Sequence, residues 1–141
     1  MLRAALFALL LLAVPAAGAT LRVSNDWGGP VDDRVKQIAR LEAAGTQVRI
    51  TGVCASACTL YLKLPTTCVA PGAKLGFHGP QADNDLGGLP LDTFNRYQRL
   101  MASHYPAKLS AWFLQGPGAD MDGEEWLSAR QVIAMGVPAC T

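Results

Sequence analysis

Ser56 is the residue of this sequence that is best placed to act as a nucleophile. It directly follows an expected buried strand, has an alanine on each side, and stands where a helix is expected to begin. A serine on a strand-to-helix turn is held rigidly with its hydroxyl exposed, and the free N–H groups of the helix start can stabilise an oxyanion. A serine here is also a common helix N-cap, so the position alone leaves both roles open.

His78 is a candidate general base for that hydroxyl. It lies at the end of an expected strand, where the C-terminal edge of a parallel sheet opens into a crevice. The other histidine, His104, lies within an amphipathic stretch and is expected to be a hydrogen-bonded structural residue. A serine hydroxyl needs a proton acceptor within reach, so Ser56 and His78 together favour acyl-transfer chemistry more than either does alone.

The four cysteines indicate two disulfides and not a metal site. They are Cys54, Cys58, Cys68 and Cys140. The first two have C-x3-C spacing, which does not match a redox C-x-x-C motif, and two histidines give no second ligand pair at zinc-finger spacing. An even number of cysteines in an exported chain is typical of disulfides, of which three pairings are open.

Residues 1–19 have the features of a secretory signal peptide. Arg3 precedes a continuous apolar run that ends in small residues, which predicts cleavage between Ala19 and Thr20. The run is shorter than the roughly 20 apolar residues that span a bilayer, so we expect no stable membrane anchor after cleavage. Residues 20–141 would then form one domain of a periplasmic or secreted protein.

Composition and charge exclude two classes of protein. Half of the residues are hydrophobic and 16% are charged, which excludes a disordered chain. The chain has 12 Lys and Arg and 11 Asp and Glu, and losing Arg3 leaves 11 of each. Nucleic-acid binding depends on basic runs that neutralise phosphates, and the sequence has none, so we expect no nucleic-acid partner.

Strands and helices are expected to alternate along the mature chain. The expected elements are a strand at 20–24, a glycine turn at 25–29, a helix from 30 to 45, a strand at 47–53, a helix at 59–64, strands at 67–70 and 74–78, a loop at 79–90, helices within 91–115, a helix at 123–135 and a strand at 137–140. This alternation favours a single α/β domain with a mainly parallel sheet and flanking helices.

The order of these motifs resembles the catalytic subunit of the Clp protease and, more broadly, the Clp/crotonase superfamily. In that family a strand ends in a glycine turn, here Asn25–Gly29, and the next strand ends at a small-residue turn that holds the nucleophilic serine, here Gly52–Ala57. The family histidine closes a short strand after a proline, here Pro71–His78. The resemblance implies a Clp/crotonase-like fold, shortened at its N-terminus because the family carries a further strand and helix before the glycine turn.

The resemblance also implies roles for residues of the site. Ser56 would be the nucleophile, His78 the general base, and the backbone N–H groups of Gly29 and Ala57 the oxyanion hole. Glycine suits this position because it lets the backbone approach a bound carbonyl closely. A serine–lysine dyad, as in signal-peptide peptidases of the same superfamily, would use Lys63 or Lys74, but His78 at the matching place disfavours it.

The third member of the triad is an aspartate just before the last helix in the family. Aligning Trp126–Ala129 with that helix puts Glu124 at this position, so a longer carboxylate replaces the aspartate. Asp120, Asp122 and Glu125 are the alternatives, and each also suits a solvated acidic segment at a helix start.

The disulfide pairing follows partly from the resembling fold. Its final strand, which would carry Cys140, runs near the strand that carries Cys68. A sharp turn can bring Cys54 and Cys58 within the roughly 7 Å that a bridge requires. The predicted pairs are therefore Cys54–Cys58 and Cys68–Cys140.

These features predict an exported serine hydrolase, in the first place a peptidase, that acts on a peptide or protein substrate without a metal or cofactor. The alternative is a catalytically silent binding or scaffold protein of the periplasm, which the replaced acid and the shortened fold both permit. An acyl-CoA enzyme is disfavoured because the chain lacks clustered basic residues for the phosphates. Periodicity does not separate core from interface in residues 91–115, so a homo-oligomer stays open.

Overall fold

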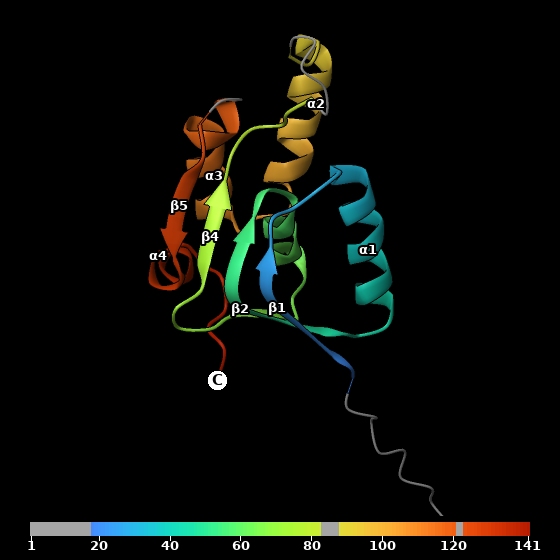
Figure 1. The fold of residues 1–141 in the computed structure, drawn as a ribbon, viewed down its shortest axis with the longest axis vertical. Coiled ribbons are helices and arrows are strands. Elements are labelled where there is room, and N and C mark those ends of the chain that lie inside the picture. Colours follow the sequence, from blue (N-terminus) through green and yellow to red (C-terminus); the bar gives the residue numbers. More distant parts are fainter. Residues whose placement is uncertain (1–17, 83–87, 121–122) are drawn as a thin grey trace, which may run out of the picture.

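Strands and helices alternate along the chain in the computed structural model, which describes residues 18–82, 88–120 and 123–141 (Figure 1). The predicted signal peptide lies outside these residues except for its last two positions, and Asp122 lies outside them as well. The elements are β1 (Thr20–Asp26), α1 (Val31–Ala43), β2 (Gln47–Ala55), the 3-10 helix η1 (Ser56–Lys63), β3 (Thr67–Val69), β4 (Lys74–Phe77), α2 (Leu91–Ala102), α3 (Ala107–Gln115), the 3-10 helix η2 (Pro117–Ala119), β5 (Glu125–Ser128) and α4 (Ala129–Ala134).

The five strands form one sheet in the order β1-β2-β4-β5, with β3 paired to β2 as well. β1, β3 and β4 run parallel to β2, and β5 runs antiparallel to β4. The prediction of a single α/β domain with a mainly parallel sheet is therefore confirmed. Because β2 and β4 are parallel neighbours, the residues that follow them, Ser56 and His78, emerge at the same edge of the sheet.

α2 stands at that edge of the sheet. In Figure 1 the arrows of β2 and β4 point towards α2, whereas α4 and the C-terminus lie at the opposite end of the molecule. α1 flanks the sheet on the side of β1. The C-terminal ends of the central strands therefore lie at the end of the molecule where α2 stands.

The centre of the fold is η1. Each residue from Ala57 to Leu62 is 5% exposed or less, so this helix is buried on all sides. Phe77, the last residue of β4, packs edge to face against Tyr105 and Trp112, with ring centroids 5.6 and 5.3 Å apart. Ser56 and His78 are consequently attached to the buried core of the molecule.

Two expectations for the C-terminal region are wrong. The expected helix at 123–135 is strand β5 followed by the shorter α4. The helix begins late because Ser128 forms a capping box, in which its hydroxyl accepts from the Gln131 N–H and the Gln131 side chain accepts from the Ser128 N–H. The expected strand at 137–140 is reduced to one isolated bridge between Val69 and Ala139.

His104 has the structural role that the sequence predicts. It is buried, and its Nδ1 lies 2.8 Å from the Leu100 carbonyl oxygen. Burial lowers the pKa of its imidazole, so the neutral form is favoured inside the fold. Within the described ranges, no helix is long and apolar enough to cross a bilayer.

Candidate active site

The chain turns sharply at Ser56, between β2 and η1. Ala55 is extended, whereas Ser56 has φ +56°, and no other non-glycine residue in the described ranges has a positive φ. Such a conformation is strained for a residue with a side chain, and strain of this kind is concentrated at functional sites. Ala55 is the N-cap of η1 and no side chain caps this helix, so the Ser56 hydroxyl does not act as an N-cap.

Buried contacts hold this turn in place. The Cys54–Cys58 disulfide brackets it, with the two Cα atoms 5.3 Å apart. The Thr59 hydroxyl donates to the Ser56 carbonyl oxygen at 2.7 Å and lies 2.8 Å from the Tyr105 hydroxyl. Because the Thr59 proton is already used, the Tyr105 hydroxyl donates in that second contact.

The second disulfide joins Cys68 to Cys140, with Cα atoms 4.9 Å apart, and ties the C-terminus to β3. The structure thus contains the two pairs that the sequence predicts. Two disulfides fit an oxidising compartment. The described residues contain no cluster of histidine, cysteine and acidic side chains that could hold a metal ion.

The glycine turn between β1 and α1 lies directly against Ser56. Gly28 has φ +101°, and a Cβ atom on it would stand 2.6 Å from Ser56 Cβ and 2.9 Å from the Ala57 nitrogen. Only glycine fits there. Gly29 has φ +122°, and a Cβ atom on it would meet nothing within 4 Å, because this residue borders open space.

A cavity of about 520 Å³ opens at this edge of the sheet, and both Ser56 and His78 line it. This volume is in the usual range for small-ligand sites. Gly29 and the start of α1 form one wall, and Tyr97 and Met101 of α2 form another. The Tyr97 hydroxyl donates to Asp32 Oδ2 at 2.8 Å, which joins α2 to α1 beside the cavity. Neither Lys63 nor Lys74 lines it.

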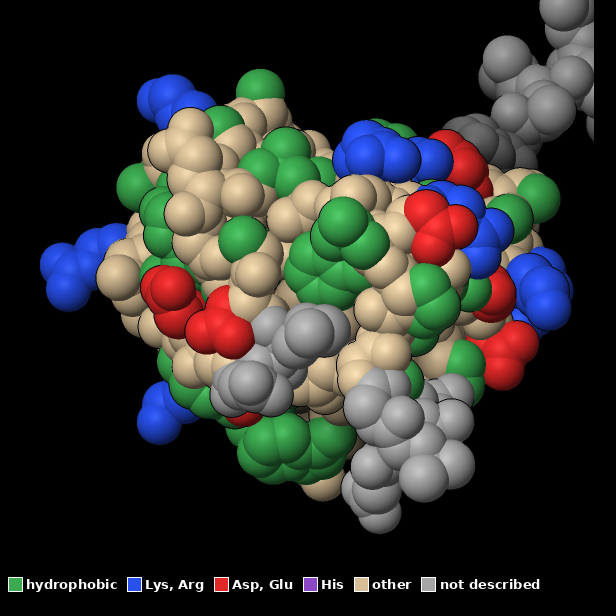
Figure 2. All heavy atoms as spheres, turned by 90° about the horizontal axis from the view of Figure 1, so that it is seen from above, with side chains coloured by type: hydrophobic (Ala, Val, Ile, Leu, Met, Phe, Trp, Pro, Cys, Tyr) green, Lys and Arg blue, Asp and Glu red, His purple; other side chains and the backbone are tan. Residues whose placement is uncertain are grey.

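The sequence did not assign the α2 residues to the site. Tyr97 and Met101 belong to an apolar stripe, and a stripe of this kind does not distinguish a core face from a cavity wall. Figure 2 views this end of the molecule from above. Hydrophobic side chains lie near the centre of the visible face among atoms of the backbone and of uncharged polar residues, and Lys and Arg lie mainly towards its edges.

A main-chain carbonyl orients the His78 ring. Nδ1 lies 2.6 Å from the Gly79 oxygen, which can only accept, so Nδ1 carries the proton of the neutral ring. Nε2 is then unprotonated, so it can accept the proton of a serine hydroxyl as a general base. The Gly79 N–H donates to the Asp120 carbonyl at 2.9 Å, which anchors the residue that carries the acceptor.

Glu124 directly precedes β5. The antiparallel β4–β5 register ends with the pair of Phe77 and Glu125, so His78 and Glu124 both lie just beyond the same end of this ladder. The carboxylate lies over Gly76, where an added Cβ would be 2.7 Å from Glu124 Oε1. In the described residues, Nδ1 of His78 is therefore bound by the main chain, and the Glu124 carboxylate lies over Gly76, two positions before His78.

Comparison with known proteins identifies the fold. No protein-family model matches this sequence, and no curated protein matches it. A structure of the membrane-bound stomatin-specific protease 1510-N, a mutant in complex with a substrate peptide, superimposes with a TM-score of 0.63 at 19% identity. The alignment covers 84% of this chain and 58% of that protease, so this chain spans little more than half of its length.

The ClpP protease catalytic domain from Plasmodium falciparum superimposes with a TM-score of 0.58 at 13% identity, and the alignment covers 86% of this chain and 67% of that one. The chain therefore shares the fold of these two proteases, which is the fold that the order of its motifs predicts.

Proposed function

We propose that this chain, which has a Clp/crotonase-like protease fold, is a serine peptidase with Ser56 as nucleophile and His78 as general base. The observation that carries the proposal is the strained Ser56, whose hydroxyl caps no helix and which lines one cavity together with His78. The orientation of the His78 ring by Gly79 supports it, because it leaves Nε2 free to accept a proton.

The reaction follows from these roles. His78 Nε2 takes the proton of the Ser56 hydroxyl as Oγ attacks the substrate carbonyl carbon. The N–H groups of Gly29 and Ala57 stabilise the resulting oxyanion. The C–N bond then breaks, the protonated His78 gives its proton to the leaving amine, and water hydrolyses the acyl-Ser56 ester by the reverse sequence of proton transfers.

The substrate in this proposal is a peptide or protein segment. The two superimposed structures are both of proteases. Trp27 and Trp126 are 62% and 41% exposed, pack edge to face, and offer apolar surface beside the glycine turn and Glu124. The predicted signal peptide and the two disulfides support a periplasmic or secreted location.

A catalytically silent scaffold is the second candidate. It is favoured because Glu124 is exposed with its carboxylate over Gly76, whereas Nδ1 of His78 is bound by the Gly79 carbonyl. A homo-oligomer is compatible with both candidates.

Labelling with a fluorophosphonate probe separates the two candidates. We expect the folded mature protein to react once and the heat-denatured protein not to react, because only the folded site activates the hydroxyl. The adduct is expected on the tryptic peptide Ile50–Lys63, in which Ser56 is the only serine. Folded protein that does not react would favour the scaffold, and an adduct on another peptide would contradict the role of Ser56.

A Glu124→Gln variant tests the third member of the triad. Neutralising an aspartate that itself binds the imidazole costs roughly 10⁴-fold. Because the Gly79 carbonyl already holds the His78 ring, we expect a smaller loss in labelling rate, about ten- to a hundredfold, from the missing negative charge. Glu125→Gln is the matched control, since Glu125 pairs with Phe77 and is expected to change the rate less than about twofold. Equal rates in the two variants would remove Glu124 from the mechanism.

A further inference from the structure

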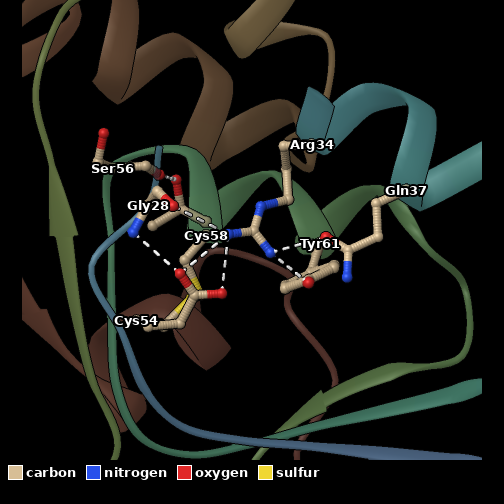
Figure 3. Close-up of polar contacts among 9 residues, drawn as sticks. Gly28, Arg34, Gln37, Cys54, Ser56, Cys58 and Tyr61 are labelled. Atoms are coloured by element: carbon tan, nitrogen blue, oxygen red, sulfur yellow. Dashed lines mark hydrogen bonds and ion pairs between the residues drawn. A yellow bond between two sulfur atoms is a disulfide. The ribbon is translucent and has the colours of Figure 1, made fainter. Parts of the chain in front are cut away.

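Arg34 reaches from α1 to the glycine turn that borders Ser56 (Figure 3). Its side chain is only 10% exposed. Nη2 donates to the Gly28 carbonyl oxygen at 3.2 Å and to Asp26 Oδ1 at 2.9 Å, and it lies 2.8 Å from Asp26 Oδ2. The guanidinium therefore joins the end of β1 to the glycine turn.

The same side chain is anchored on its other side by η1. Nη1 donates to the Tyr61 hydroxyl and, at 3.1 Å, to Gln37 Oε1. The guanidinium carbon lies 4.6 Å from the centroid of the Tyr61 ring, within the range of a cation–π contact. Since Tyr61 belongs to the buried η1, Arg34 cannot shift without losing several contacts at once.

Both polar groups of Gly28 are bound in this network. Its N–H donates to Asp26 Oδ1 at 2.9 Å, and its carbonyl accepts from Arg34. The Gly28 carbonyl and the Gly29 N–H belong to the same peptide unit, and the described residues contain no cis peptide bond. In a trans peptide these two groups point in opposite directions.

The orientation of the Gly29 N–H is thus set by the contact on Gly28. While Arg34 holds the carbonyl oxygen, the N–H of the same peptide is turned away from the guanidinium, and Gly29 borders the cavity. No atom of the described residues accepts a hydrogen bond from this N–H. In Figure 3 the Ser56 hydroxyl also points away from Arg34.

Without the guanidinium this peptide would lose the hydrogen bond that holds its carbonyl oxygen. The residues on both sides of it are glycines, which lack the Cβ atom that restricts other residues. A rotated peptide would place a carbonyl oxygen, which repels an oxyanion, where a donor is required.

We propose that Arg34 is a positioning residue that fixes the peptide between Gly28 and Gly29 so that its N–H serves the oxyanion hole. The inference rests on the proposed function for its catalytic consequence and on the hydrogen bonds above for its structural one. Partly buried ion pairs add little net stability, so the main role of the ion pair between Arg34 and Asp26 would be to orient this peptide.

The catalytic arm of the test compares Arg34→Met, Arg34→Lys and the control Lys36→Met. Lys36 lies on the same helix, and its side chain is 69% exposed. We expect Arg34→Met to lower kcat and the fluorophosphonate rate about a hundredfold with KM changed less than about twofold, because the lost donor acts on the transition state. Arg34→Lys should recover part of the rate, because its ammonium group keeps the charge but lacks the planar fork of donors, and Lys36→Met should match wild type.

The structural arm does not depend on catalysis. In protein labelled with ¹⁵N-glycine, the Gly29 amide is expected to give one sharp signal in wild type and a broadened or doubled signal in Arg34→Met. An unchanged Gly29 signal in folded Arg34→Met would overturn the proposal, as would labelling of this variant at the wild-type rate. If the wild-type protein is not labelled but the Gly29 signal changes in Arg34→Met, only the proposed function is overturned. If Arg34→Met does not fold, Arg34→Lys carries both readouts, with a smaller loss expected.

Discussion

Ser56→Ala is expected to lose all probe labelling, and His78→Ala to lose at least about a thousandfold in both labelling and peptide hydrolysis. The first change removes the attacking oxygen. The second removes the proton acceptor, and general-base catalysis by a positioned side chain contributes roughly 10²–10⁴-fold. Both rates can be followed with the same probe and with a fluorogenic peptide.

Two controls make this prediction specific. Ser110→Ala removes a half-buried hydroxyl on α3 and should leave the labelling rate unchanged. Imidazole added to His78→Ala should restore part of the rate, because the shortened side chain leaves space in the cavity, whereas imidazole should not restore Ser56→Ala. Wild-type labelling in folded His78→Ala would show that another group activates Ser56.

The first half of the fold could be predicted because its signals are local. Alternating apolar residues mark β1 and β2, and Pro30 and Gly45 bracket α1. The turn at Ser56 is likewise encoded within a few residues, by small side chains at the end of a strand. The position of the candidate nucleophile can therefore be predicted from residues that are close to it in the sequence.

The elements of the C-terminal region depend on contacts between distant residues. β5 has only four residues, and its identity as a strand depends on pairing with β4, about 50 positions earlier in the chain. The same residues also match a helical pattern, but in the structure the capping box at Ser128 sets the start of α4. Length and periodicity do not resolve an element whose partner is so distant.

In the candidate site, too, some residues can be predicted from local sequence and others depend on contacts between distant residues. The sequence predicts Ser56, His78 and the glycine turn, which lie at the ends of recognisable elements. It does not predict Arg34, because its contacts with Asp26 and Tyr61 join residues 8 and 27 positions away. Nor does it predict that the Gly79 carbonyl holds the His78 ring. Every residue has a backbone carbonyl, so residue types do not indicate which carbonyl accepts a hydrogen bond from a side chain.

The two glycines of the turn serve different needs, and this difference has consequences for mutation. Gly28 is required by space, because the Ser56 turn occupies the position of its missing side chain. Gly29 is required by conformation, because its φ of +122° is unfavourable for any residue with a Cβ atom. A substitution at Gly28 therefore moves the nucleophile itself, in addition to straining the backbone.

Gly28→Ala is accordingly expected to lower the rate of labelling at Ser56 at least about a hundredfold. The new methyl group would stand 2.6 Å from Ser56 Cβ and 2.9 Å from the Ala57 nitrogen, so the nucleophile and one oxyanion donor must both shift. Gly72→Ala is the matched control, because Gly72 also has a positive φ, +89°, but has open space around it and precedes β4 at the end away from His78. Both variants bear the roughly 1–2 kcal/mol cost of a left-handed alanine, so both should melt a few degrees below wild type. Only Gly28→Ala should lose activity, and equal labelling of the two folded variants would show that the contact between Gly28 and Ser56 does not position the nucleophile.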